Sequence, residues 1–246
     1  MERILVIGET CKDIFIYCNA TRIAPDLPVP VLELEYSTEN PGMAMNVQRN
    51  ILNIFRHCDL VTNSNWQSVT KTRYVHSATN HMFIRIDTPH LFTRINLKEV
   101  NLDYSMVVIS DYNKGFLFEE DIFDISTRHP LVLLDTKKIL GDWAEKCKFI
   151  KINDYEFERS KPYLTSILSE KIIHTKGSEG AFFQGEHFGV SKMDLRDSSG
   201  AGDAFMAALS VRYLESGNIQ EAIKYANACA SQVVTERGVT TLTRKF

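Results

Sequence analysis

The sequence has no surplus of positive charge and no stretch that is long and apolar enough to cross a membrane. Its 28 lysines and arginines face 31 aspartates and glutamates, which gives a net charge of -3. Because nucleic-acid-binding surfaces are usually basic, we expect no nucleic-acid partner. No apolar run approaches the ~20 residues of a membrane span, and the first residues lack the apolar core of a signal peptide. We therefore expect a cytoplasmic protein without a membrane partner.

Regularly spaced disulfide-forming or metal-binding residues are also absent. The five cysteines, at positions 11, 18, 58, 147 and 229, include no C-x-x-C pair. An odd and scattered set argues against a disulfide framework and favours reduced thiols, most of them small core residues. The seven histidines form no H-x-x-x-H or H-E-x-x-H group, so we expect no zinc site.

Three widespread functional motifs are missing as well. There is no G-x-x-x-x-G-K-[ST] loop, no G-x-G-x-x-G after the first strand and no G-x-S-x-G elbow. These absences disfavour P-loop nucleotide hydrolases, dinucleotide-binding oxidoreductases and serine hydrolases. What remains is an ordinary globular composition, with 44% hydrophobic residues in a chain of 246. That length suffices for one large core or two small ones.

One segment carries an evident chemical signal: residues 197–205, with the sequence DSSGAGDAF, followed by an apolar run. A glycine-rich turn that opens a helix directs several backbone N–H groups and the positive end of the helix dipole at one point, where negative charge is stabilised. Asp203 stands where its carboxylate could take a proton from a hydroxyl drawn to that point. A base beside an anion site is the minimum equipment for phosphoryl transfer to an alcohol. Simple helix capping would explain the same residues without any chemistry.

The rest of the chain alternates between strand and helix patterns. Apolar runs predict strands at 3–7, 106–109, 131–134, 149–152 and 172–175 and a hairpin at 181–190. Helical spacing predicts helices at 43–55, 119–128, 141–147, 155–168, 202–215 and 219–235. This alternation is typical of a parallel α/β sheet covered by helices on both faces.

Two segments, at about 13–36 and 69–87, have a different residue pattern from the rest of the chain. They alternate apolar and polar residues and contain turn signals, which is typical of a sheet with one face in water. We expect them to form a small antiparallel layer, or lid, that stands off the main sheet. The segment 61–68 between them is weakly patterned.

Polar residues follow the predicted parallel strands and should share one edge of the sheet, where ligands of such sheets bind. They are Asp111, Lys114, Asp135, Lys137, Asn153, Glu156 and Lys176. Asn153 and Glu156 are one helical turn apart and could both face a hydrated Mg²⁺ ion. Capping of the following helix would explain this pair equally well.

Several of these motifs together resemble a known family. The segment 197–205 resembles the signature of the ribokinase (PfkB-type) carbohydrate kinases, Asn153-x-x-Glu156 resembles their Mg²⁺/phosphate motif, and residues 175–180 resemble their nucleotide-side strand and turn. Further segments resemble, in order, the heptose-7-phosphate kinase branch, which in relatives is the N-terminal half of a bifunctional ADP-heptose synthesis protein. These segments are 4–8, 22–25, 28–31, 41–47, 71–75, 84–87, 110–115 and 226–228. The likeness covers nearly the whole chain.

The resemblance implies a single ribokinase-like domain over residues 1–246, a three-layer α/β/α sheet with a β lid. It implies an ATP-dependent kinase that phosphorylates the anomeric hydroxyl of D-glycero-D-manno-heptose 7-phosphate to the 1,7-bisphosphate. Asp203 would be the catalytic base, and the γ-phosphate would be held by Gly200, Ala201 and Gly202. The sugar hydroxyls would be bound by Asp13, Gly42 and Asn46.

The resemblance also implies the nucleotide and partner contacts. Mg²⁺ would be organised through water by Asn153 and Glu156, and ATP would lie along Thr175, Gly177, Gly180 and Asn227; a need for K⁺ stays open. A phosphorylated sugar needs cations, for which the candidates are Arg22, Arg73, Arg85, Lys114 and Lys137, the last two best placed at strand ends. In relatives the lid also joins two subunits, so we expect a homodimer.

The chain departs from the family pattern in three places. Relatives have paired glycines where this chain has Gly42-Met43, so a side chain stands where backbone usually meets the sugar. The segment between 56 and 71 is shorter than in relatives, and we expect the loss of a βαβ unit there. The nucleotidyltransferase half of the bifunctional relatives has no counterpart, so we expect a separate protein to perform the next step. Two alternatives stay open: a kinase for another sugar or nucleoside, and a non-catalytic module that binds nucleotide or sugar.

Overall fold

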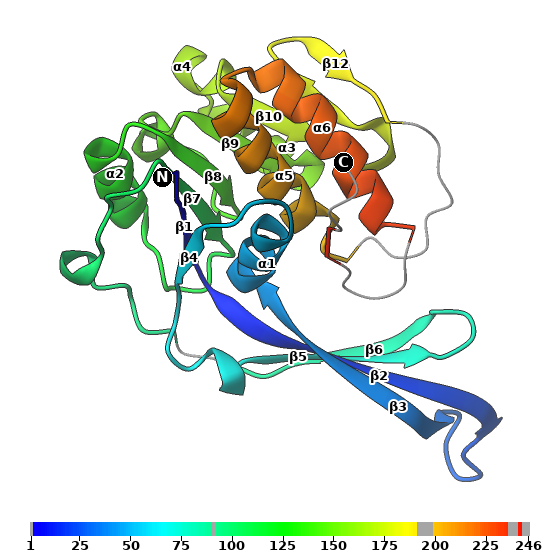
Figure 1. Ribbon diagram of the computed structural model, residues 1–246. Coiled ribbons are helices and arrows are strands. Elements are labelled where there is room, and N and C mark those ends of the chain that lie inside the picture. The colour runs from blue at the N-terminus through cyan, green and yellow to red at the C-terminus, as the bar shows by residue number, and fades with distance from the viewer. Residues whose placement is uncertain (1, 90–91, 191–198, 236–240, 243–246) are drawn as a thin grey trace.

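A computed structural model describes residues 2–89, 92–190, 199–235 and 241–242. In this part of the chain the strands form an eight-stranded sheet, in the order β12-β11-β10-β9-β8-β7-β1-β4, and a four-stranded sheet, in the order β3-β2-β5-β6. The smaller sheet projects from one end of the larger one (Figure 1). No described helix has the length and apolar character needed to span a membrane.

The large sheet is parallel except at one edge. Its parallel strands are β1 (Ile4–Gly8), β4 (Cys58–Val61), β7 (Met106–Asp111), β8 (Val132–Thr136), β9 (Phe149–Asn153) and β10 (Ile172–Thr175). The antiparallel edge consists of β11 (Ala181–Phe183) and β12 (Glu186–Phe188). Strands covered on both faces form continuous apolar runs, and this pattern made the parallel strands other than β4 predictable.

Helices cover both faces of the large sheet (Figure 1). One face carries α1 (Ala44–Ile54), α5 (Ala201–Ser216) and α6 (Ile219–Val233). The other face carries α2 (Glu119–Arg128), α3 (Asp154–Ser160) and α4 (Ser166–Ser169). The predicted three-layer α/β architecture is therefore confirmed.

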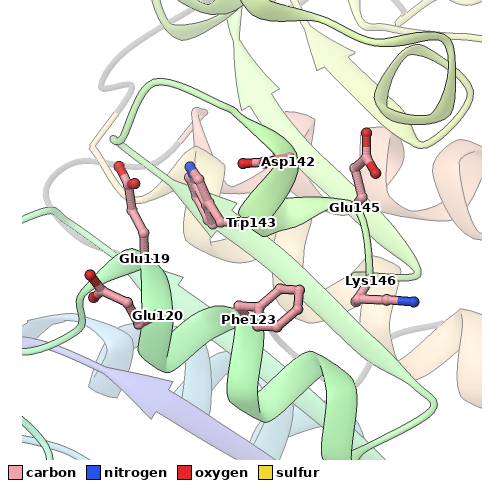
Figure 2. A pocket seen from close by; sticks show the side chains of 7 residues that line it. All are labelled: Glu119, Glu120, Phe123, Asp142, Trp143, Glu145 and Lys146. Atoms are coloured by element: carbon pink, nitrogen blue, oxygen red, sulfur yellow. The ribbon is translucent and has the colours of Figure 1, made fainter.

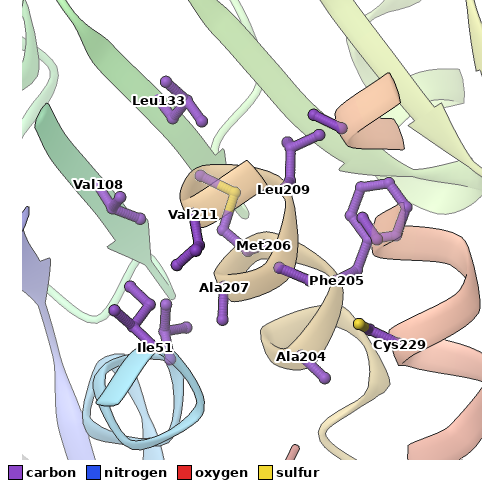
Figure 3. Packing of buried hydrophobic residues seen from close by; sticks show 14 of the residues in the cluster. Ile51, Val108, Leu133, Ala204, Phe205, Met206, Ala207, Leu209, Val211 and Cys229 are labelled. Carbon is purple, nitrogen blue, oxygen red and sulfur yellow. The ribbon is translucent and has the colours of Figure 1, made fainter. Parts of the chain in front are cut away.

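The helix α5 is the centre of one of the two cores. Its residues 203–211 are all buried, as expected for a helix that is apolar on every side. Figure 3 shows Met206 and its neighbours between Val108 and Leu133 of the sheet, Ile51 of α1 and Cys229 of α6. The glycine-rich turn before α5 is thus anchored by a rigid and well-buried element.

The lid consists of β2 (Thr10–Ile23), β3 (Pro30–Met43), β5 (Thr70–His76) and β6 (Met82–Asp87). The pairs β2–β3 and β5–β6 are antiparallel, but β2 and β5 are parallel. The prediction of a wholly antiparallel layer was therefore wrong. After β3 the chain passes through α1 and β4 before it returns to the lid, so β5 enters in the same direction as β2.

Three further differences concern local elements. The edge strand β4 was not predicted, because Cys58–Val61 is too short and too mixed to show a pattern. The helix expected at 155–168 is interrupted: α3 ends at Ser160, and a 3₁₀ turn that contains Pro162 follows, since proline cannot donate a helical hydrogen bond. The helix expected at 141–147 is only the 3₁₀ turn Asp142–Ala144. The loss of a βαβ unit between 56 and 71 stays a prediction.

All five cysteines are free and buried, as expected. Burial raises the pKa of the Cys11, Cys58 and Cys147 thiols to about 12 and that of Cys229 to about 11. Thiols with such pKa values carry almost no thiolate at neutral pH, so these four are packing residues rather than nucleophiles.

Candidate active site

Among the residues that the structure describes, no side chain caps the first amides of α5, so they are uncovered there. Gly200 is the N-cap and has a φ of 82°, a left-handed conformation that glycine adopts without strain. Glycine brings no side chain to cap the helix, and the first-turn N–H groups have no acceptor within the helix. Asp203 lies in this first turn and is not the capping residue. The capping explanation of Asp203 is therefore excluded, whereas Asp197 and Ser198 lie outside the described residues.

The carboxylate of Asp203 is buried and held by two donors from distant parts of the chain. The Asn46 amide of α1 donates to Oδ2 at 2.8 Å, and the Tyr112 hydroxyl, just after β7, donates to Oδ1 at 2.8 Å. Burial raises the pKa of Asp203, and these two hydrogen bonds oppose that rise without cancelling it. A carboxylate with a raised pKa is a better proton acceptor than an exposed one, which suits the role of general base.

The loop that carries Tyr112 is fixed by Glu9, a residue that the sequence reasoning missed. Glu9 accepts hydrogen bonds from the backbone N–H groups of Tyr112 and Lys114, each at 2.8 Å. Its carboxylate is fully buried, and burial together with the nearby charge of Asp111 raises its pKa. Lys114 contributes its backbone to this contact, while its side chain is exposed.

On the lid side, the predicted sugar-binding residues Asp13 and Gly42 face each other across β2 and β3. A Cβ atom at position 42 would lie 2.1 Å from Asp13 Oδ2, so a larger residue there would displace the Asp13 carboxylate. Arg73 of β5 forms an ion pair with Asp13, and its guanidinium lies 5.0 Å from the centre of the Phe15 ring. Asp13 thus lies on β2 of the lid, and Asn46 lies on α1, which follows β3 directly.

Two lid cations differ from what the sequence suggested. Arg85 forms a two-pronged pair with Asp87 of the same strand, with both contacts at 2.8 Å, and is half exposed. Lys71 instead lies beside the residue that follows β7: its ammonium is 5.1 Å from the centre of the Tyr112 ring. A charged residue in the short lid strand 70–76 is ordinary, so no sequence signal separated Lys71 from its neighbours.

At the end of β9, Asn153 and Glu156 form a reciprocal cap of α3. Asn153 Oδ1 accepts from the Glu156 N–H at 3.0 Å, and Glu156 Oε2 accepts from the Asn153 N–H at 2.8 Å. Lys137 also pairs with Glu156. Burial would lower the pKa of Lys137, but Asp135 and Glu156 outweigh it, so the ammonium stays charged.

Asn153 and Glu156 can cap α3 and still contact a metal ion through water. Carboxylate and amide oxygens suit Mg²⁺, which keeps most of its waters and needs few protein ligands. Within the described residues, no cluster of three or more acidic, histidine or cysteine side chains could hold a metal directly. The oxygens of Asn153 and Glu156 are of the kind that hydrated Mg²⁺ accepts, and the contact through water stays a prediction.

The residues expected along ATP gather at the end of β10. The Thr175 hydroxyl donates to the Ile152 carbonyl at 3.3 Å, and Gly177 has a φ of 51°. Gly180 and Asn227 meet at one atom: a Cβ at position 180 would lie 2.1 Å from the Phe188 carbonyl oxygen, to which the Asn227 amide donates at 2.7 Å. Both therefore shape this corner, and their contact with a nucleotide stays a prediction.

A hollow of about 440 Å³ lies elsewhere, between α2 and the 3₁₀ turn at 142–144 (Figure 2). Its lining residues are Glu119, Glu120, Phe123, Asp142, Trp143, Glu145 and Lys146. None of them contributes to the cluster around Asp203, so this hollow is separate from the candidate site.

Comparison with known proteins identifies the family. The pattern of the pfkB family of carbohydrate kinases matches residues 45–245. The bifunctional protein HldE of Helicobacter pylori strain G27 is 27% identical to this chain and aligns with 97% of it and 64% of its own length. HldE of Hydrogenovibrio crunogenus is 25% identical over 98% of this chain and 61% of its own length. The chain thus spans just under two thirds of these relatives.

Solved structures show the same fold. Ribokinase from Thermotoga maritima aligns with 100% of this chain and 97% of its own length, with a TM-score of 0.77 and 17% identity. A nucleoside kinase of Methanocaldococcus jannaschii aligns with 99% of this chain and 95% of its own, with a TM-score of 0.74 and 18% identity. The chain has the ribokinase-like α/β fold and belongs to the pfkB family of carbohydrate kinases, and it is a sugar kinase.

Proposed function

We propose that this kinase transfers the γ-phosphoryl group of ATP to the anomeric hydroxyl of D-glycero-D-manno-heptose 7-phosphate, giving the 1,7-bisphosphate. The observation that carries the proposal is the Asp203 carboxylate, buried beside the uncovered first turn of α5 and aimed by Asn46 and Tyr112. The names of the bifunctional HldE relatives and the heptose-kinase-like lid segments support this substrate.

The reaction follows from this arrangement. The sugar hydroxyl attacks the γ-phosphorus, a new O–P bond forms, the bond to ADP breaks, and the hydroxyl proton passes to Asp203. The first-turn amides of α5 donate to the transferred group, where they act on developing charge. When bound through Asn153 and Glu156, Mg²⁺ would neutralise charge on the nucleotide phosphates.

A substrate that already carries a phosphate on carbon 7 also needs a cation, and this cation lies away from the base because carbon 7 is at the opposite end of the sugar from the anomeric hydroxyl. Arg73 is paired with Asp13, and Lys137 is paired with Glu156. Lys71 lies beside Tyr112, and among the residues that the structure describes no carboxylate pairs with it. Lys71 is therefore the cation best placed to take the substrate phosphate.

A coupled assay of ADP release tests the proposal. With ATP and Mg²⁺, heptose 7-phosphate is offered beside ribose, fructose, fructose 6-phosphate and adenosine, and we expect turnover on the heptose. D203N should lower kcat by about 10²–10⁴, the usual loss on removal of a general base. D59N is the matched control, because Asp59 also accepts from a tyrosine hydroxyl, that of Tyr104 at 2.9 Å, but lies outside the site. Equal rates of D203N and wild type would exclude Asp203 as the base.

A kinase for another sugar or nucleoside is the second candidate, and Met43 favours it. Met43 has a φ of 61° and packs with Cys11 and Val69 beside Tyr112, where relatives have glycine. A side chain at this border alters the space offered to the sugar. The same substrate panel decides: the highest kcat/KM on a sugar other than the heptose would favour this second candidate.

We further propose that two copies pair through their lids. The edge strand β6 exposes Met82, Ile84 and Ile86, each about half accessible. An exposed apolar edge strand invites pairing with another chain. Light scattering should give a dimer for the wild type and a monomer for I84K/I86K. I167K, at an equally exposed isoleucine of α4, should stay dimeric. A monomeric wild type would contradict this proposal.

A further inference from the structure

The strand β9 carries one charged residue within an apolar run. Its neighbours Ile150 and Ile152 are buried in the core under α2 and α4, so alternation along the strand turns Lys151 to the opposite face, where Phe149 packs under α5. Only 4% of the Lys151 side chain is exposed. A lysine is almost never buried to this degree unless a partner compensates its charge.

The partner is Asp135 on the adjacent strand β8, in register with Lys151. The ammonium lies 2.8 Å from Asp135 Oδ2. The other carboxylate oxygen, Oδ1, is buried and has no hydrogen-bond partner among the described residues. A pair that only stabilises the fold needs its remaining oxygens satisfied, because burying both charges costs several kcal/mol. An unsatisfied buried oxygen therefore points to a role beyond stability.

The position of the ammonium shows what that role is. A Cβ atom at Gly202 would lie 3.0 Å from Lys151 Nζ, so the ammonium is directly against the first turn of α5. A methyl group at position 202 would crowd the ammonium, which would have to move by a few tenths of an ångström. Both charges act on the Asp203 carboxyl: that of Asp135 raises the pKa of Asp203, and that of Lys151 lowers it. The pair therefore lies beside the base and the uncovered amides.

We propose that Lys151 is a catalytic residue that contacts the transferred phosphoryl group at the first turn of α5, held in place by Asp135. This inference rests on the proposed phosphoryl transfer to a hydroxyl at Asp203 and adds to it a cation supplied by the sheet. Lys151 keeps its proton throughout. It neutralises part of the charge spread over the three equatorial oxygens while the bond to the sugar oxygen forms and the bond to ADP breaks. Neutral amides supply only partial positive charge, so a full charge at this point adds a separate contribution.

The test compares two variants that differ only in the ammonium. D135N keeps the ammonium and offers it an amide oxygen, while K151M/D135N removes both charges and leaves no unpaired ion. Relative to D135N, the double variant should lower kcat by about 10²–10³, the loss typical of one donor to a developing anion. The dissociation constant for ADP and the circular dichroism spectrum should match those of D135N. Equal kcat values in the two folded variants would overturn the proposal and leave a purely structural pair.

A second measurement is independent of the sugar. The planar ion AlF₄⁻ mimics the phosphoryl group in the transition state. In D135N, ADP with AlF₄⁻ should therefore bind more tightly than ADP alone. This gain should be lost in K151M/D135N. If the gain depends on Lys151 while the heptose is not phosphorylated, the substrate proposal fails and the Lys151 proposal stands. If the gain is the same in both variants, the Lys151 proposal fails, whichever sugar is used.

K151Q covers the case in which the double variant does not fold. Its amide can still donate to Asp135 but carries no charge. K151Q should lose kcat and AlF₄⁻ binding as the double variant does. Full activity of folded K151Q would contradict the need for a cation.

Discussion

The hydroxyl of Tyr112 offers the sharpest test of the site, because Y112F removes one atom and leaves the ring. That hydroxyl donates to Asp203 Oδ1 at 2.8 Å, and the carboxylate is only 6% exposed. The hydrogen bond favours the charged carboxylate and so holds the pKa of Asp203 below the value that burial alone would set. Loss of the bond should therefore raise this pKa further.

The expected size of this pKa shift follows from the strength of the hydrogen bond that Y112F removes. A hydrogen bond to a charged group contributes about 1.5–3 kcal/mol, and one pKa unit corresponds to about 1.36 kcal/mol, so the pKa should rise by about one to two units. The base must be deprotonated to act. The acid limb of log kcat/KM against pH should thus move to higher pH by the same amount, with the plateau at alkaline pH within about threefold of wild type.

The effect on stability has a defined sign. The folded pKa of Asp203 already lies above its ordinary value, and Y112F raises it further. A raised carboxyl pKa destabilises the fold at pH values above it. The variant should therefore be less stable than wild type at neutral pH, and the difference should shrink as the pH falls through the folded pKa of Asp203 and the carboxyl becomes protonated in both proteins.

The assay measures the initial rate of ADP release from pH 5 to 9, together with urea unfolding at pH 4 and 7. Y104F is the matched control: Tyr104 donates to Asp59 at 2.9 Å at the surface, and its removal should leave the acid limb in place. A shift of less than about 0.3 unit in Y112F, or a shift to lower pH, would refute the view that this hydroxyl tunes the base.

Three further predictions concern backbone strain, packing and the metal. Met43 has a φ of 61°, a backbone conformation that strains every residue except glycine. M43G should therefore be more stable than M43A by about 1 kcal/mol in urea unfolding, although glycine is usually the less stable of the two. A less stable M43G would show that the backbone at position 43 is not strained. G180A should lower the free energy of unfolding by more than about 1 kcal/mol, because φ is 94° and the new Cβ atom would meet the Phe188 carbonyl. G217A is the control: φ is 66° and no atom lies near the new Cβ, so its free energy of unfolding should fall by less. E156Q should raise the Mg²⁺ concentration for half-maximal rate about 10–100-fold, and an unchanged Mg²⁺ dependence would exclude Glu156 from the metal site.

Five of the six parallel strands that the structure describes were readable from the sequence, because strands covered on both faces form apolar runs; the exception is β4. The turn at 200–203 was readable because its chemistry is local: glycines, a following apolar helix and one carboxylate lie within a few residues. The capping pair Asn153 and Glu156 was visible for the same reason, at a spacing of one helical turn.

Other features could not be predicted from short stretches of the sequence. The strand β4 is short and mixed, and the parallel pairing of β2 with β5 depends on the path of the chain through α1. Arg85 stays a candidate for substrate binding, but its ion pair with Asp87 could not be predicted from the sequence. Charge type and strand position were known for these residues, but strand direction and pairing are properties of the folded chain.

The sequence by itself determined the parallel α/β sheet and the lid segments and singled out Asp203 as the expected base, because hydrophobic periodicity and turn chemistry act over a few residues. Only the tertiary structure decided what surrounds that base. Asn46 is 157 residues from Asp203 and Tyr112 is 91 residues away, yet both hydrogen-bond to its carboxylate. Lys151 showed in the sequence only as a charge in an apolar strand, and its pairing with Asp135 against Gly202 came with the fold. Hydrogen bonds and ion pairs form wherever packing brings groups together, and that proximity is not encoded in local sequence.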